Sequence, residues 1–206
     1  MNFRAARLSQ FALTCLISLF LLFINTVAQT GTTTPQPSPM PSQQSTPAPT
    51  PSTPVANPAD VGSIDAILIA VYDVISGPAG KKRDWDRMRS LFIPGARLIP
   101  TGPRPGGVYG SRVLTVEDYV TRGSALFEKE GFFEKEIARK TESFGQIAHV
   151  FSTYEARHSP DDAKPFIRGI NSIQLMNDGK RWWIVTIFWD SERAGLVIPD
   201  KYLPRK

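Results

Sequence analysis

The stretch RWWIVTIFWDSE, Arg181 to Glu192, decides the fold of this chain. A strand with one buried face alternates apolar and polar residues, but this stretch is apolar on both faces. The side chains on one face are Trp183, Val185, Ile187 and Trp189. A strand of this kind needs cover on both sides, and we expect the protein core to supply only one of the two covers.

A tight turn is predicted just before this strand. The sequence NDGK, Asn177 to Lys180, contains an Asp-Gly pair that suits a two-residue type I′ loop. Such a loop would join strands 166–177 and 181–191 and pair Ser172 with Val185. Residues directly opposite share a face. The first face would then carry Arg168, Ile170, Ser172, Gln174 and the odd-numbered residues from Trp183 to Trp189.

The strand 145–157 is predicted to extend the first face. If Glu155 lies opposite Arg168, then His149 and Phe151 join that face, which mixes polar and apolar groups and is expected to line a cavity. The second face is more uniformly apolar. We expect it to form a homodimer interface, unless another part of the chain covers it. Its residues are Ile173, Leu175, Trp182, Ile184 and Phe188.

The rest of the folded part is helical before it is extended. Apolar residues at helical spacing predict a helix over 64–75, and Asp84 is a predicted N-cap for a short helix that follows. Thr115 and Asp118 resemble a capping box that opens a third helix. From Phe132 onward the chain is predicted to form strands. This segregation predicts an α+β fold, with N-terminal helices packed on a strongly curved antiparallel or mixed β-sheet.

The N-terminus is predicted to be an export signal over 1–28. Arg4 and Arg7 precede an apolar run from Phe11 to Ile24, which is shorter than the ~20 residues that a spanning helix needs. We expect export to a bacterial periplasm or to the medium. The alternative is an uncleaved signal that anchors the chain to the membrane. Residues 29–60 contain nine prolines and are predicted to be a disordered linker, so the folded domain is expected over 61–206.

Charge and cysteine content exclude several classes of function. Without the predicted signal, the chain has 22 basic and 19 acidic residues, and no basic run exceeds Lys81-Lys82-Arg83. No nucleic-acid surface is therefore predicted. The one cysteine, Cys15, lies in the signal, and the two histidines have no metal-ligand spacing. The sequence predicts neither a metal site nor a cofactor.

The order of elements and three stretches resemble the nuclear transport factor 2-like (NTF2-like) superfamily, especially its bacterial SnoaL-like members. The stretches are WDRMRSLF, GQIAHVFSTYEAR and DGKRWWIVTIFWDS. The resemblance covers about 61–195. It implies a cone-shaped domain with a pocket between sheet and helices, commonly dimeric through the outer sheet face. It also implies relatives that are isomerases, dehydratases, hydrolases or cyclases, beside many without known activity.

Three polar residues are candidates for catalysis. His149 could act as a general acid or base in a cleft, since histidine exchanges protons near neutral pH. Arg168 could hold an oxyanion through its planar fork, with Glu155 orienting it. The other interpretation is structural: a hydrogen-bonded histidine and a cross-strand ion pair.

Aromatic residues are candidates for lining an apolar pocket, although rings at these spacings also suit a plain core. They are Trp85, Phe92, Tyr109, Tyr119, Phe151, Trp183 and Trp189. The sequence thus predicts a domain that binds a small, largely apolar molecule. The alternatives are an isomerase, dehydratase or hydrolase that uses His149, Arg168 and Glu155, and a non-catalytic dimeric assembly module.

Overall fold

The structure is a computed structural model that describes residues 53–205. These residues belong to one compact unit. The predicted signal over 1–28 and most of the predicted linker lie outside the described residues. The last residues of that linker do not follow the prediction, because helix α1 (Pro58–Val61) includes them. Asp60 is buried and pairs with Arg87 at 2.8 Å, so the folded domain begins before residue 61.

Helices are concentrated in the first half and strands in the second, as the sequence predicts, but β1 and β2 lie between α3 and α4. The further helices are α2 (Ile64–Ile75), α3 (Trp85–Leu91) and α4 (Val116–Lys129), with short 3₁₀ helices η1 (Pro105–Gly107) and η2 (Asp200–Tyr202). The strands are β1 (Phe92–Pro103), β2 (Tyr109–Ser111), β3 (Phe133–Phe144), β4 (Ile147–Arg157), β5 (Ile167–Asn177) and β6 (Trp182–Ser191).

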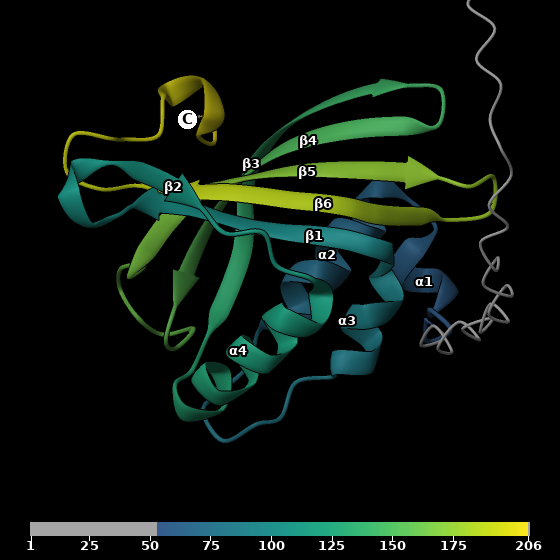
Figure 1. Ribbon diagram of the computed structural model, residues 1–206, viewed down its shortest axis with the longest axis horizontal. Coiled ribbons are helices and arrows are strands. Elements are labelled where there is room, and N and C mark those ends of the chain that lie inside the picture. Colours follow the sequence, from purple (N-terminus) through teal and green to yellow (C-terminus); the bar gives the residue numbers. More distant parts are fainter. Residues whose placement is uncertain (1–52, 206) are drawn as a thin grey trace, which may run out of the picture. The chain divides into compact units, whose positions relative to one another are not determined.

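The strands form one mixed sheet in the order β2-β1-β6-β5-β4-β3, in which only β1 and β6 run parallel. The sheet curves around α2, α3 and α4, which lie on one side of it (Figure 1). The predicted α+β cone is confirmed. We call the helix-covered side the inner face and the other side the outer face.

Side-chain caps fix where the helices begin. The Asp84 carboxylate accepts a hydrogen bond from the Arg87 amide, as predicted for an N-cap. At α4, the Thr115 hydroxyl accepts from the Asp118 amide while the Asp118 carboxylate accepts from the Thr115 amide, so the predicted capping box is present. These local signals explain why the helix boundaries agree with the sequence prediction.

The β5–β6 register differs from the prediction. Strand pairing stops at Asn177 and Trp182, so the connection has four residues instead of two, and Val185 forms a bulge. Beyond the bulge Ser172 pairs with Phe188, not with Val185. The bulge reverses which side chains face inward along the rest of β6, because side chains alternate along a strand.

The chain after β6 folds back over the outer face. We call residues 192–203 the C-terminal strap; in Figure 1 it lies across the sheet from the helices. The Tyr202 carbonyl accepts a hydrogen bond from the Thr153 hydroxyl at 2.6 Å, and the Tyr202 ring packs on Phe151. Within the strap, the Ile198 side chain is buried. Part of the outer face is thus covered by the chain itself.

Candidate functional site

A cavity of about 350 Å³ lies between the helices and the inner face of the sheet. Most of its wall is apolar, and that wall consists of Val71, Ile75, Met88, Leu98, Leu126, Phe127, Phe132, Phe166, Ile167, Ile173 and Ile187. Six lining residues carry polar atoms: Tyr72, Tyr119, Glu134, Tyr154, Asn171 and Trp189. Such a concave apolar wall with a few polar groups is typical of a small-molecule site.

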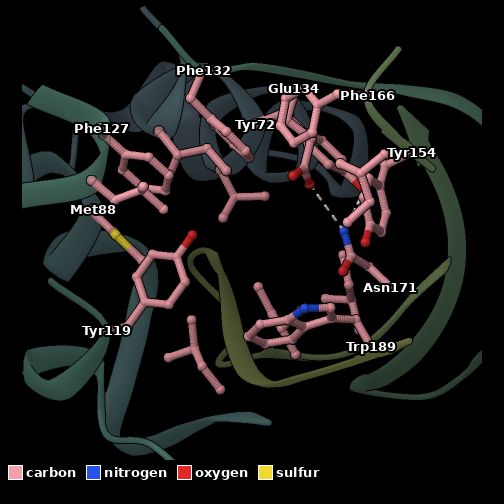
Figure 2. Close-up of a pocket in the computed structure, with 17 residues that line it drawn as sticks. Tyr72, Met88, Tyr119, Phe127, Phe132, Glu134, Tyr154, Phe166, Asn171 and Trp189 are labelled. Carbon is pink, nitrogen blue, oxygen red and sulfur yellow. Dashed lines mark hydrogen bonds between the residues drawn. The ribbon is translucent and has the colours of Figure 1, made fainter. Parts of the chain in front are cut away.

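Glu134 is the only carboxyl side chain in this wall. Figure 2 shows its carboxyl pointing into the cavity, toward the Asn171 amide. Glu134 lies near the start of edge strand β3, whose backbone would otherwise have no partner on its free side. The segment after α2 supplies that partner: the Ser76 hydroxyl accepts from the Glu134 amide at 3.0 Å, and Gly77 pairs with Phe132. The strand that carries the carboxyl is thereby attached to α2.

Asn171 holds the carboxyl from the neighbouring side of the sheet. Its side-chain nitrogen donates to Glu134 Oε1 at 3.3 Å and to the Tyr72 hydroxyl at 3.1 Å. The Tyr72 hydroxyl also lies 2.7 Å from the Ser152 hydroxyl, which donates to Glu136. These bonds fix the side chains that surround Glu134 before any ligand binds.

Burial makes Glu134 a weak acid. It raises the pKa of the carboxyl to about 8, against an opposing effect of the Asn171 hydrogen bond. At neutral pH this side chain is therefore protonated in most molecules, and the neutral carboxylic acid can donate a hydrogen bond. Burial, together with the nearby Glu134 charge, also raises the pKa of Tyr72 and Tyr119. Both phenols stay neutral donors.

Two further tyrosines complete the polar groups of the cavity. The Tyr119 hydroxyl points into the cavity from α4 (Figure 2), and its ring packs edge-on against Trp189 at 6.4 Å. The Tyr154 hydroxyl instead pairs with the Ser191 hydroxyl at 2.8 Å. Gly169 leaves room for it, since a Cβ there would lie 2.6 Å from the Tyr154 oxygen. Glu134 and Tyr119 are thus the groups best placed to donate to a ligand oxygen.

The structure distributes the predicted pocket aromatics over several places. Tyr119 and Trp189 line the cavity, and Trp85 stacks on Phe127 behind the wall. Phe92 is buried in the core. The other three lie elsewhere: Tyr109 is exposed under Arg193, Phe151 lies on the outer face, and Trp183 lies under Arg181.

The three predicted catalytic residues lie on the outer face, away from the cavity. The register that places Glu155 opposite Arg168 is confirmed. However, Glu155 pairs with Arg157 and Lys135, while Arg168 lies 3.6 Å from Glu192. The His149 ring pairs with the Ser172 hydroxyl at 3.0 Å. The predicted grouping around a pocket is therefore wrong, because the inner and outer faces of β4 and β5 are exchanged relative to the prediction.

The predicted dimer face is corrected in the same way. Ile173, Leu175 and Ile184 are buried in the core of the inner face, and Trp182 packs against that core. Only Phe188 lies on the outer face, where its side chain is 45% exposed. A homodimer through the outer face stays a prediction, but other residues would form it.

Glu134 and Asn171 are the functional candidates that the sequence analysis missed. Glu134 lies in FEKEGFFEKEIARK, where dense alternating charge is typical of a solvated edge strand. Its two preceding phenylalanines were a signal that this end of the strand is buried. Asn171 is a polar residue in the middle of an apolar strand, on the same face as Ile173 and Leu175, and the prediction took that face for the outer one.

The described residues contain no group of three or more His, Cys, Asp or Glu side chains arranged to hold a metal ion. Within residues 53–205, no helix is long and apolar enough to cross a membrane.

No family model matches the sequence, and no curated protein matches it. Solved structures do match, among them an NTF-2-like protein of unknown function from Silicibacter pomeroyi, which is 13% identical with a TM-score of 0.44 over 64% of this chain and 94% of its own. A cystatin-like-fold protein of unknown function from Nostoc punctiforme is 9% identical, with a TM-score of 0.48 over 63% and 88%. The CaMKII hub of S. rosetta is 16% identical, with a TM-score of 0.38 over 62% and 90%.

Two of the matched structures are described as NTF2-like proteins of unknown function. At such identities the likeness concerns the path of the chain alone, and no function is taken from it.

Proposed function

We propose that this protein binds a small, largely apolar molecule that carries a hydrogen-bond acceptor, such as a carbonyl oxygen. The observation that carries the proposal is the Glu134 carboxyl, which is directed into a largely apolar cavity and has its pKa raised by burial to about 8. The apolar wall would supply most of the binding free energy. The neutral acid would orient the ligand by donating to its oxygen.

A pair of aromatic probes tests this proposal. 2-Acetonaphthone carries a ketone, whereas naphthalene carries no acceptor. We expect the ketone to bind about five- to thirtyfold more tightly than naphthalene at about pH 6, since one hydrogen bond to a buried donor is worth about 1–2 kcal/mol. Near pH 9.5 the advantage should shrink to the part that the Tyr119 hydroxyl supplies, because a carboxylate cannot donate. Both affinities can be measured by calorimetry.

Substitutions at Glu134 provide the controls. In Glu134→Gln the amide donates at every pH, so the preference for the ketone should remain and lose its pH dependence. In Glu134→Leu the preference should fall at every pH to the part that Tyr119 supplies. Equal affinity of the two probes for the wild type at about pH 6, or a ketone preference that is undiminished in Glu134→Leu, would contradict the proposal.

A second candidate function is acid–base catalysis at the same site, with Glu134 in place of His149, Glu155 and Arg168. A group with a pKa of about 8 can both take and return a proton near neutral pH. Ionised Glu134 would remove a proton from the carbon beside a carbonyl, and Tyr119 would stabilise the resulting enolate oxygen. The test is deuterium incorporation into the methyl group of 2-acetonaphthone in D₂O. Wild type should accelerate it, and Glu134→Gln should not.

We also propose that the chain forms a homodimer through the part of the outer face that the C-terminal strap leaves open. Phe144 and Ile147, at the β3–β4 turn, are 85% and 61% exposed. Phe188 on β6 is exposed as well. Large exposed apolar side chains on one sheet face favour a protein contact. A dimer that only holds this contact, with an empty cavity, is the assembly-module alternative.

Export remains part of the proposal, on the basis of the sequence of residues 1–28. N-terminal sequencing of the protein recovered from outside the cytoplasm is expected to begin at Gln29. A chain that retains Arg4 and Arg7 and stays with the membrane would instead support the anchor alternative.

A further inference from the structure

Glu134 and Tyr72 line two hollows. Besides the cavity, they line a groove of about 530 Å³ between α2 and β3, which we call the α2–β3 groove. The wall of the cavity is almost entirely apolar, but the groove is rich in charged groups. These are Asp73, Lys135, Glu136, Arg139 and Arg157. Glu134 therefore stands between an apolar space and a polar one.

Hydrogen-bonded groups connect this wall to the surface. From Tyr72 the chain of contacts runs through the Ser152 hydroxyl to Glu136, which pairs with Arg139 at 2.6 Å. Arg139 also pairs with Asp65 at 2.7 Å, and the Asp65 side chain is 77% exposed. Groups of this kind hold water in a polar groove, which an apolar cavity wall does not.

The mouth of the cavity has the opposite character. Two of its lining residues, Leu126 and Phe166, are 51% and 48% exposed and mark where the cavity meets solvent. Both are apolar, so a ligand that fills the cavity would expel water from this side of Glu134. The carboxyl would then need another path to gain or lose its proton.

We propose that the α2–β3 groove is the proton entrance of Glu134, so that the ligand reaches the carboxyl from one side and water reaches it from the other. When Glu134 ionises, its O–H bond breaks, the electron pair stays on the carboxylate, and the proton passes to water in the groove. This inference rests on the proposed function only in that the ligand occupies the cavity. The groups that face Glu134 are Tyr72 from α2, Tyr119 from α4, Tyr154 from β4, Asn171 from β5 and Glu136 on its own strand.

Two tryptophan substitutions test this proposal as a matched pair. Ile69 lines the groove but not the cavity, and its side chain is 66% exposed. Leu126 lines the cavity but not the groove. Ile69→Trp should obstruct the groove, and Leu126→Trp should obstruct the cavity mouth. Both positions have room at the surface, so both variants are expected to fold.

The measurement is the proton-exchange rate of the Glu134 carboxyl, taken from the carbon-13 line shape of its side chain at the midpoint of its titration. The spectrum of Glu134→Gln assigns the signal. We expect Ile69→Trp to slow exchange by about tenfold and Leu126→Trp to change it by less than about twofold. This difference is expected if water reaches the Glu134 carboxyl only through the α2–β3 groove. The wild type saturated with 2-acetonaphthone should exchange about as fast as the free protein.

The proposal would be overturned if Leu126→Trp slowed proton exchange, alone or together with Ile69→Trp. It would also be overturned if neither variant slowed proton exchange. The comparison of the two variants needs no ligand, so it stands even if 2-acetonaphthone does not bind. Failure of the probe to bind would count against the proposed function alone, and an unchanged rate in Ile69→Trp would count against the groove alone.

Discussion

A carboxyl group in an apolar wall ties the stability of this protein to pH. The pKa of Glu134 is raised from 4.5 to about 8, because burial disfavours the charged form. As pH rises above about 4.5, the unfolded chain loses this proton first, while the folded protein keeps it up to about pH 8. The folded state then binds more protons, so the free energy of unfolding falls with rising pH across this window.

Glu134→Gln should remove this dependence, because the amide does not titrate. Relative to wild type, we expect the variant to gain stability between about pH 5 and about pH 8, by up to about 1.4 kcal/mol per pH unit. Urea unfolding at several pH values measures it. Glu142→Gln, on the exposed half of the same strand, is the matched control and should follow the wild type. A constant difference between Glu134→Gln and wild type over this range would show that Glu134 does not titrate as described.

At the scale of elements, one buried arginine joins the ends of two helices. The Arg83 guanidinium is buried and donates to five backbone carbonyls. They belong to Ile75, Gly77, Pro78, Lys81 and Phe127, at the C-terminal ends of α2 and α4 and in the loop after α2. A positive charge is favourable there, because helix C-termini carry partial negative charge.

Arg83→Lys should destabilise the protein by about 2–4 kcal/mol, because an ammonium group has three donors and no planar fork. Thermal or urea unfolding measures the loss. Arg122→Lys, on the exposed side of α4, should change stability by less than about 0.5 kcal/mol. Similar small effects at both positions would mean that the carbonyls around Arg83 are satisfied without it.

Elements could be predicted from the sequence because their signals are local. Caps at Asp84 and Thr115, and the helical spacing of apolar residues over 64–75, act within a few residues. The family resemblance implies a cavity, but most of its lining could not be predicted, since the lining depends on which face of the sheet points inward. The bulge at Val185 has no glycine or proline to mark it, yet it decides that Trp189 faces inward opposite Asn171. Glu134 was missed for a related reason: its environment is supplied by α2, which is distant in sequence.

At the scale of the whole molecule, both apolar faces of the final strand have an explanation. The inner face contributes Ile184, Ile187 and Trp189 to the core and cavity. The outer face is covered in part by the C-terminal strap, so less of it is free for a partner than the sequence predicts. A dimer would have to use the open part near Phe144 and Ile147, and stable interfaces bury about 1,200–2,000 Å² in total.

Light scattering after size-exclusion chromatography tests the dimer. We expect the wild type to have twice the mass of one chain, and Phe144→Lys and Ile147→Lys each to weaken association by about tenfold or more, because each places a charge in the apolar contact. Val113→Lys is the matched control, as Val113 is a similarly exposed apolar residue outside this region of the sheet. A wild type that is monomeric at high concentration, or equal effects of all three substitutions, would exclude this interface.

The bulge at Val185 also sets how the final strand tolerates changes in its length. Two residues there oppose one on β5, so β6 contains one residue more than the ladder needs. A chain that lost Val185 could close into a regular ladder in which Thr186 still pairs with Gln174 and Trp189 still faces the cavity. An added residue could not be accommodated in this way. It would turn Trp189 outward, and the Phe188 ring would replace the indole in the cavity wall. Among descendants of this sequence, shortening here should therefore preserve the wall of the cavity, whereas lengthening should change it.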